Sequence, residues 1–159
     1  NKTNLKFNDR NLDKGSEIAG IFLADLNVDE KIIEHVSDII KNISFKGANV
    51  KNTITTKEGM IVQDADRLDA IGAMGIGRAF AYGGFMKREM YNPDVSHEIH
   101  NTFEEYKNKS GSTINHFYEK LLLLKDKMNT KTGKEKAEKR HEFMRSFLDE
   151  FYSEWNGEL

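Results

Sequence analysis

Three carboxylates lie close together in an otherwise apolar segment of this 159-residue chain. Asp64, Asp66 and Asp69 occur in the stretch from Ile61 to Phe80. On a helix that turns by about 100° per residue, Asp64 and Asp69 are expected inside an apolar arc and Asp66 at its edge, the arc being formed by Ile61, Val62, Ala65, Leu68, Ile71 and Gly72. A carboxylate is rarely buried without a cation, so we expect a metal ion, an Arg or a Lys at this face.

Three interpretations of this acidic segment compete. In the first, the aspartates pair with Arg67, Arg78 or another basic group and fix helix packing, which is a common structural role. In the second, they bind a hard divalent cation, for which carboxylates are preferred ligands. The third is a phosphate loop over residues 72–77, but the spacing there is G-x-x-G-x-G and no strand is expected before it. Small residues at these positions also favour close packing of two helices.

The histidines offer a second group of candidates. His116 and Lys120 are four residues apart on an expected helix and can face the same side. They form either a partly exposed helix edge or a pair that binds phosphate or donates a proton. His97 and His100 are three residues apart, which departs from the H-E-x-x-H spacing of zinc sites, and we expect them to be solvated.

The composition excludes several functional classes. The net charge is -2, so no overall field attracts the chain to a nucleic acid polymer or an anionic membrane. No apolar run approaches the about 20 residues of a membrane span, and no signal-peptide pattern is present. The absence of Cys excludes disulfides and thiolate metal sites and fits a reducing compartment, so we expect a cytoplasmic protein.

Helical periodicity dominates the chain, and the expected fold class is all-α. Helices are predicted over residues 14–25 and over 29–43 with Asn27 as the cap. The helix with the acids follows a Thr55 or Thr56 cap and runs to about residue 71, and two more helices are predicted over 113–128, capped by Thr113, and over about 134–155. Residues 85–112 are polar and contain Pro93, and we predict a flexible insert with one helical piece near residues 98–106. We expect a single domain over residues 1–159, with its core in about 6–84 and 113–155.

The segment from Gln63 to Gly72, Q-D-A-D-R-L-D-A-I-G, resembles the HD-domain metal-dependent phosphohydrolases, most closely their small stand-alone bacterial members. The similarity continues in residues 40–46, 75–84, 113–121 and 130–140, so it covers the chain from about residue 6 to 155. The resemblance implies an HD-domain helical bundle with one divalent metal ion, Mn, Mg, Fe or Zn. In that family the metal is held by a His, a His-Asp pair and a later Asp.

The resemblance also implies roles for the residues of the acidic segment. Asp66 matches the last metal ligand of the family, and Asp64 and Asp69 become neighbours that orient ligands and bind nearby cations. Arg78 is expected to pair with these aspartates or to contact a substrate phosphate, with pairing favoured.

The chain departs from the family pattern because it contains no His-Asp pair and no upstream His helix. The bundle therefore resembles an N-terminally incomplete one, since Lys6-Phe7 matches residues that follow the His-Asp motif. We expect the chain as given neither to hold a metal tightly nor to hydrolyse phosphate esters. We also expect apolar surface to be exposed around Phe22 and Ile61.

For the complete protein, the resemblance implies a phosphohydrolase that acts on a nucleotide or related phosphate ester, with metal-activated water as the nucleophile. Contact with the small phosphorylated substrate is assigned to three catalytic candidates, Lys6, His116 and Lys120, of which Lys6 is a phosphate-facing cation. The alternative is a non-catalytic helical scaffold or interaction domain whose aspartates are structural ion-pair partners. A homodimer through the long C-terminal helix is a further expectation.

Overall fold

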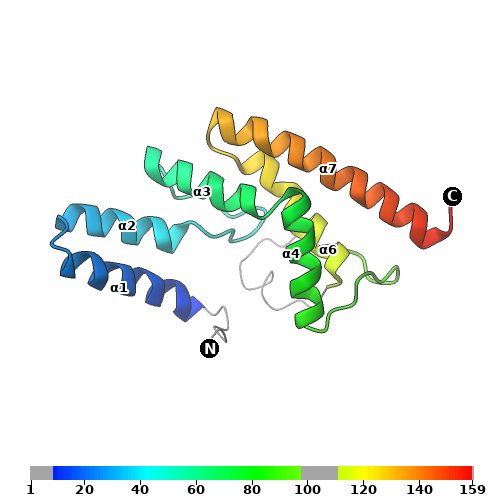
Figure 1. Ribbon diagram of the computed structural model, residues 1–159, viewed down its shortest axis with the longest axis horizontal. Coiled ribbons are helices and arrows are strands. Elements are labelled where there is room, and N and C mark those ends of the chain that lie inside the picture. Colours follow the sequence, from blue (N-terminus) through cyan, green and yellow to red (C-terminus); the bar gives the residue numbers. More distant parts are fainter. Residues whose placement is uncertain (1–8, 98–110, 159) are drawn as a thin grey trace. The chain divides into compact units, whose positions relative to one another are not determined.

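The computed structural model describes residues 9–97 and 111–158, and over these ranges it contains helices and no strand (Figure 1). This confirms the all-α fold class. The chain divides into two compact units, residues 1–45 with 52–59 and residues 46–51 with 60–159. The division does not test the expected single domain over residues 1–159, which stays a prediction. None of the described helices is long and apolar enough to cross a membrane.

The first unit contains two helices packed side by side, α1 (Asp9–Asp25) and α2 (Glu30–Asn42) (Figure 1). Asp29 caps α2, because its carboxylate accepts a hydrogen bond from the backbone N–H of Lys31 at 3.0 Å. The prediction that Asn27 is the cap is wrong. Asn27 instead turns the chain in the left-handed region with a φ of 56°. Phe22 is 63% exposed, as expected.

The acidic segment lies on α3 (Lys57–Asp69), which begins after Thr56. The hydroxyl of Thr56 accepts a hydrogen bond from the backbone N–H of Gly59 at 3.3 Å, in agreement with the expected cap. The next helix, α4, covers Gly72–Phe85. The glycines of residues 72–77 therefore form the first turns of a helix, and the interpretation of a phosphate loop is wrong. A Cβ on Gly75 would collide with the backbone of Ala70, which explains a glycine there.

The second unit has an aromatic and aliphatic core between α4, α6 (Thr113–Glu119) and α7 (Lys131–Asn156). The ring of Phe80 lies 6.1 Å from that of Phe117 and 5.9 Å from that of Phe147. Helix α7 begins at Lys131 after the Thr130 cap, three residues before the predicted start at residue 134, and is followed by Gly157 with a φ of 71°. Other buried members of this core are Ile76, Ile114, Leu121, Leu124, Met128, Ala137, Met144 and Leu148.

The predicted continuous helix over residues 113–128 is wrong in its middle. Ser112, not Thr113, caps α6 by accepting from the backbone N–H of Asn115 at 3.2 Å. The α-helix then stops at Lys120, whose φ of -142° and ψ of -60° are not helical, and a 3-10 helix, η1 (Leu121–Lys127), follows. Residues three apart eclipse in a 3-10 helix, so Leu121 and Leu124 enter the core together.

The segment after α4 is tied to the start of α6. The backbone N–H of Arg88 donates to the carbonyl of Gly83 at 2.9 Å. The N–H of Thr113 donates to the carbonyl of Glu89 at 2.9 Å, and that of Ile114 donates to Met90 at 3.1 Å. The helical piece expected near residues 98–106 lies outside the described residues.

The expected burial pattern of α3 is wrong. Val62 and Ala65, which were placed in the apolar arc, are exposed. Ile61 is 58% exposed, in agreement with the apolar surface expected around it. Asp69 is exposed as well. The buried side chains are polar instead, namely Gln63, Asp64 and Arg67. They are buried because residues 127–130 supply them with hydrogen-bond partners.

Candidate functional site

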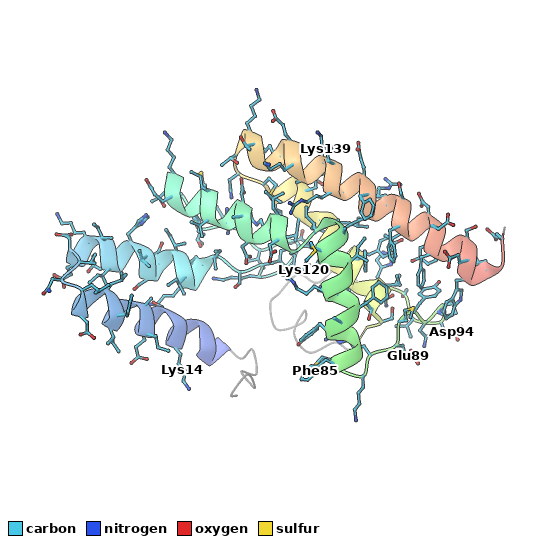
Figure 2. All side chains as sticks on the ribbon, in the orientation of Figure 1. Lys14, Phe85, Glu89, Asp94, Lys120 and Lys139 are labelled. Atoms are coloured by element: carbon cyan, nitrogen blue, oxygen red, sulfur yellow. The ribbon has the colours of Figure 1, made fainter. Side chains whose placement is uncertain are left out.

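Asp66 and Lys120 come from separate elements and act on each other electrostatically. Asp66 lies on the exposed side of α3, yet desolvation by the surrounding protein raises the pKa of its carboxyl group, with the charge of Lys120 acting in the opposite direction. Lys120 is half-buried at the break between α6 and η1 (Figure 2). Burial lowers the pKa of its ammonium group, and the Asp66 carboxylate opposes that effect. The two opposite charges therefore share one partly desolvated region.

His116 is held in its neutral form beside this pair. Burial is the main cause that lowers its pKa to about 4, and the positive charges of Lys120 and Arg88 add to the effect. Near neutral pH the imidazole is therefore uncharged and can donate one hydrogen bond and accept another. In the ligand-free protein the neutral imidazole is therefore the dominant form at that pH.

The low pKa of His116 predicts a loss of stability in mild acid. The folded protein takes up this proton near pH 4, whereas the unfolded chain takes it up near the ordinary value of 6.5, so the free energy of unfolding falls as pH drops from 6.5 towards 4. At about pH 5 the expected loss from this group is about 2 kcal/mol. Urea unfolding of wild type and His116→Gln at about pH 7.5 and about pH 5 measures it.

In the His116→Gln variant the titrating group is gone, so its stability should fall less between the two pH values. Parallel losses of stability in the two proteins would show that other groups, not His116, govern the acid sensitivity.

Asp64 is buried and makes a dense set of hydrogen bonds to the start of α7. Its side chain is 3% exposed. Oδ1 accepts from the backbone N–H and the side-chain amide of Asn129 at 2.8 and 3.0 Å. Oδ2 accepts from the backbone N–H and the hydroxyl of Thr130 at 2.8 and 2.7 Å. Burial favours the neutral acid, but these four hydrogen bonds outweigh it and lower the pKa of Asp64.

Asp69 and Arg78 form a bidentate ion pair on the surface. Nη1 of Arg78 lies 2.5 Å from Oδ2 of Asp69, and Nη2 lies 3.0 Å from Oδ1. The hydrogen bond from Arg78 is the main cause that lowers the pKa of Asp69. The pairing expected for Arg78 is therefore present, but its partner is an exposed aspartate rather than a buried one.

Arg67 is a buried structural cation of α3. It is 6% exposed, and its Nη1 donates to the backbone carbonyl of Lys127. Nζ of Lys127 in turn donates to the carbonyl of Ala48 at 2.6 Å. Hydrogen bonds of Asp64 and Arg67 thus connect the polar face of α3 to residues 127–130. Asp66 makes none of these bonds and is exposed.

Relatives of known structure identify the architecture. No protein-family model matches the chain. A crystal structure of a Lactobacillus plantarum protein has 39% identity to the chain and a TM-score of 0.81, with coverage of 91% of this chain and 68% of that one. A crystal structure of an HD-superfamily hydrolase from Bacillus thuringiensis has 43% identity and a TM-score of 0.64, with coverage of 89% and 63%. The chain belongs to the same family as the Lactobacillus protein, and its fold is HD-like.

A third relative is YpgQ of Bacillus subtilis, described as uncharacterized. It is 42% identical over 117 residues, which are 72% of this chain and 49% of YpgQ. A crystal structure of YpgQ in complex with ADP has a TM-score of 0.65 at 34% identity, covering 87% of this chain and 63% of that one. The chain thus spans about half the length of this curated relative.

The metal expected in an HD-like fold needs more ligands than the described residues bring together. Within residues 9–97 and 111–158, no group of three or more His, Asp or Glu side chains is arranged to hold an ion. Asp64 and Asp69 are engaged by Thr130 and Arg78. Asp66 is the remaining carboxylate of the segment, and one carboxylate does not form a metal site by itself.

Of the other predicted candidates, the structure describes His97, whereas Lys6 and His100 lie outside the described residues. The ring of His97 stacks on Tyr118, with 4.6 Å between the centroids. Arg88, whose charge acts on His116, was not among the residues predicted from the sequence. No local pattern marks Arg88 in the sequence, because its place depends on how α4 ends.

Proposed function

We propose that this chain is the part of a metal-dependent phosphohydrolase that carries Asp66, His116 and Lys120, acting on a nucleotide or a related phosphate ester. The similarity to the HD-superfamily hydrolase of Bacillus thuringiensis supports hydrolase chemistry. The structure of YpgQ with ADP supports a nucleotide ligand. A divalent ion with Asp66 among its ligands is part of the proposal.

One observation carries the proposal. Asp66 and Lys120 are far apart in the sequence, yet each shifts the pKa of the other, and both are partly desolvated. Desolvated ionisable groups with a specific charged partner are typical of functional sites. The other two carboxylates of the segment make structural hydrogen bonds or ion pairs instead.

Each residue has a separate part in hydrolysis. The reaction forms a bond from a water oxygen to phosphorus and breaks the bond to the leaving group, which takes up a proton. The ammonium group of Lys120 neutralises charge that develops on the phosphoryl oxygens, and partial burial strengthens this effect. Neutral His116 donates a hydrogen bond to the same anion. When bound, a divalent ion would activate the attacking water.

The test is phosphate release by the full-length protein from ATP, ADP, AMP and 4-nitrophenyl phosphate with Mn²⁺ or Mg²⁺ present. Activity that depends on Asp66 supports the proposal. Absence of release from all four substrates, with each metal ion, would count against it.

Replacing Lys120 is expected to weaken catalysis without unfolding the protein. Lys120→Gln removes the cation that faces the phosphoryl group and should lower kcat/KM about 30-fold, which corresponds to about 2 kcal/mol. The matched control is Lys125→Gln, because Lys125 lies on the following 3-10 helix and pairs with Glu138 at 3.3 Å. Steady-state kinetics measure both variants, and equal effects of the two substitutions would remove Lys120 from the site.

The alternative function is a non-catalytic helical scaffold or interaction domain, in which the aspartates serve packing. The bonds of Asp64 and Asp69 favour it, because two of the three carboxylates have structural partners. The same assays separate the two functions. A scaffold would show no phosphate release and no effect of Asp66→Asn on ligand binding.

A further inference from the structure

Arg88 is held in a fixed backbone position at the end of α4. Its N–H donates to the carbonyl of Gly83 at 2.9 Å, and the carbonyl of the next residue, Glu89, accepts from Thr113. In Figure 2 Phe85 marks this end of α4, and Glu89 lies on the segment that follows it. Backbone hydrogen bonds on both sides of Arg88 thus connect it to α4 and to α6, the helix that carries His116.

The guanidinium group of Arg88 is supported by an aromatic ring. Its Cζ lies 5.8 Å from the centre of the Tyr82 ring, within the range of a cation–π contact. A guanidinium that stacks on a ring keeps its N–H groups at the edge, where they can bind an oxyanion by two parallel hydrogen bonds. The contact with the Tyr82 ring therefore supports Arg88 without using its donors.

No carboxylate neutralises Arg88 within the described residues. The nearest acid in sequence is Glu89, and its carboxylate accepts from the side chain of Asn92 at 2.8 Å. The side chain of Arg88 is nonetheless half-buried. A half-buried, oriented guanidinium group without an acid beside it is suited to an anionic ligand.

The surroundings of His116 show that this charge belongs to the same region as Lys120. Both cations lower the pKa of His116. Asp66 acts on Lys120 as an opposing charge, whereas the described residues place no carboxylate in an ion pair with Arg88. Two cations that act on the same imidazole can each bind one anionic group of a ligand.

We propose that Arg88, supported by the Tyr82 ring, forms an anion subsite that binds a second phosphate of the ligand. The candidate site then prefers nucleoside diphosphates and triphosphates to monophosphates. This inference rests on the proposed function of Asp66, His116 and Lys120.

The experiment is calorimetric titration of the full-length protein with ADP and with AMP, for wild type, Arg88→Gln and Lys87→Asn. Lys87 is the matched control, because it is the exposed neighbouring cation and Asn tolerates its φ of 56°. We expect Arg88→Gln to weaken ADP binding about tenfold and AMP binding less than about threefold. Lys87→Asn should leave both affinities within about twofold of wild type.

A second pair of variants tests the stacking. Tyr82→Phe keeps the ring and should retain the preference for ADP, whereas Tyr82→Leu removes the ring and should reduce it. Thermal unfolding of each variant identifies any loss of fold, which would lower the affinities for ADP and AMP together.

Three results would overturn the subsite: wild type binding ADP no more tightly than AMP, Arg88→Gln weakening both ligands equally, or Arg88→Gln changing neither. These outcomes are separate from the activity assay. ADP binding that depends on Arg88 without phosphate release retains the subsite and rejects the hydrolase. Phosphate release that depends on Asp66, together with ADP binding that Arg88→Gln does not change, retains the hydrolase and rejects the subsite.

Discussion

Asp66→Asn is expected to lower kcat/KM for phosphate release by the full-length protein about 100-fold or more, equivalent to about 3 kcal/mol. The substitution keeps the size of the side chain and removes its charge. Of the three carboxylates in the acidic segment, Asp64 binds Thr130 and Asp69 pairs with Arg78. The substitution removes the third one, Asp66. It also removes the counter-charge of Lys120, a partly desolvated ammonium group. Steady-state kinetics of phosphate release measure the effect.

The matched control for Asp66→Asn is Asp69→Asn, three residues further along α3. Asp69 is an exposed carboxylate that pairs with Arg78. Its loss should change kcat/KM less than about threefold, since exposed ion pairs contribute little. Calorimetry with Mn²⁺ adds a readout independent of turnover, because only Asp66→Asn should weaken metal binding. If both variants retain full activity, Asp66 is not part of the site.

The expectations that held depended on local pattern. The period of apolar residues predicted α2 and α7, because a helix that packs on one side must repeat its apolar residues every three to four positions. Caps were predicted less well. Thr56 follows the rule, but the helix after Asn27 is capped by Asp29, since several capping residue types occur close together there.

The burial of α3 could not be predicted from its own sequence. The helical wheel assumes that the apolar face is the buried one, yet Gln63, Asp64 and Arg67 are buried here and Ile61 and Val62 are exposed. The polar side chains are buried because donors and acceptors about 60 residues away satisfy them. A long-range hydrogen-bond network leaves no periodic signal in either segment.

The candidate site was predicted in part. Asp66 and Lys120 were both named from the sequence, the first through the resemblance to HD-domain proteins. Their proximity was not derivable, because Lys120 lies where the expected helix breaks into a 3-10 turn. The backbone N–H of Lys120 still donates to the carbonyl of His116 at 3.1 Å, but the non-helical dihedrals of Lys120 change the direction of its side chain from that of a regular helix. Arg88 had no signal at all, since its position depends on the C-terminal end of α4.

Asp64→Ala is expected to destabilise the protein by about 3 kcal/mol, which lowers the melting temperature by about 10 °C. The substitution leaves four donors of Asn129 and Thr130 without their acceptor in a buried place. It also removes the contact that fastens α3 to the first turn of α7. Urea and thermal unfolding measure the loss.

The control for Asp64→Ala is Asp69→Ala, which removes an exposed carboxylate from the same helix and should cost less than about 1 kcal/mol. Because the folded pKa of Asp64 is lowered, the charged Asp64 carboxylate stabilises the fold above the unfolded pKa of 3.8, and this stabilisation is lost as pH falls below that value. Wild type and Asp64→Ala should therefore converge in stability in strong acid. Gly133→Ala should resemble Asp64→Ala, since a Cβ at Gly133 would collide with Oδ2 of Asp64. Equal stability of Asp64→Ala and Asp69→Ala would mean that α3 is held by Arg67 and the surrounding packing instead.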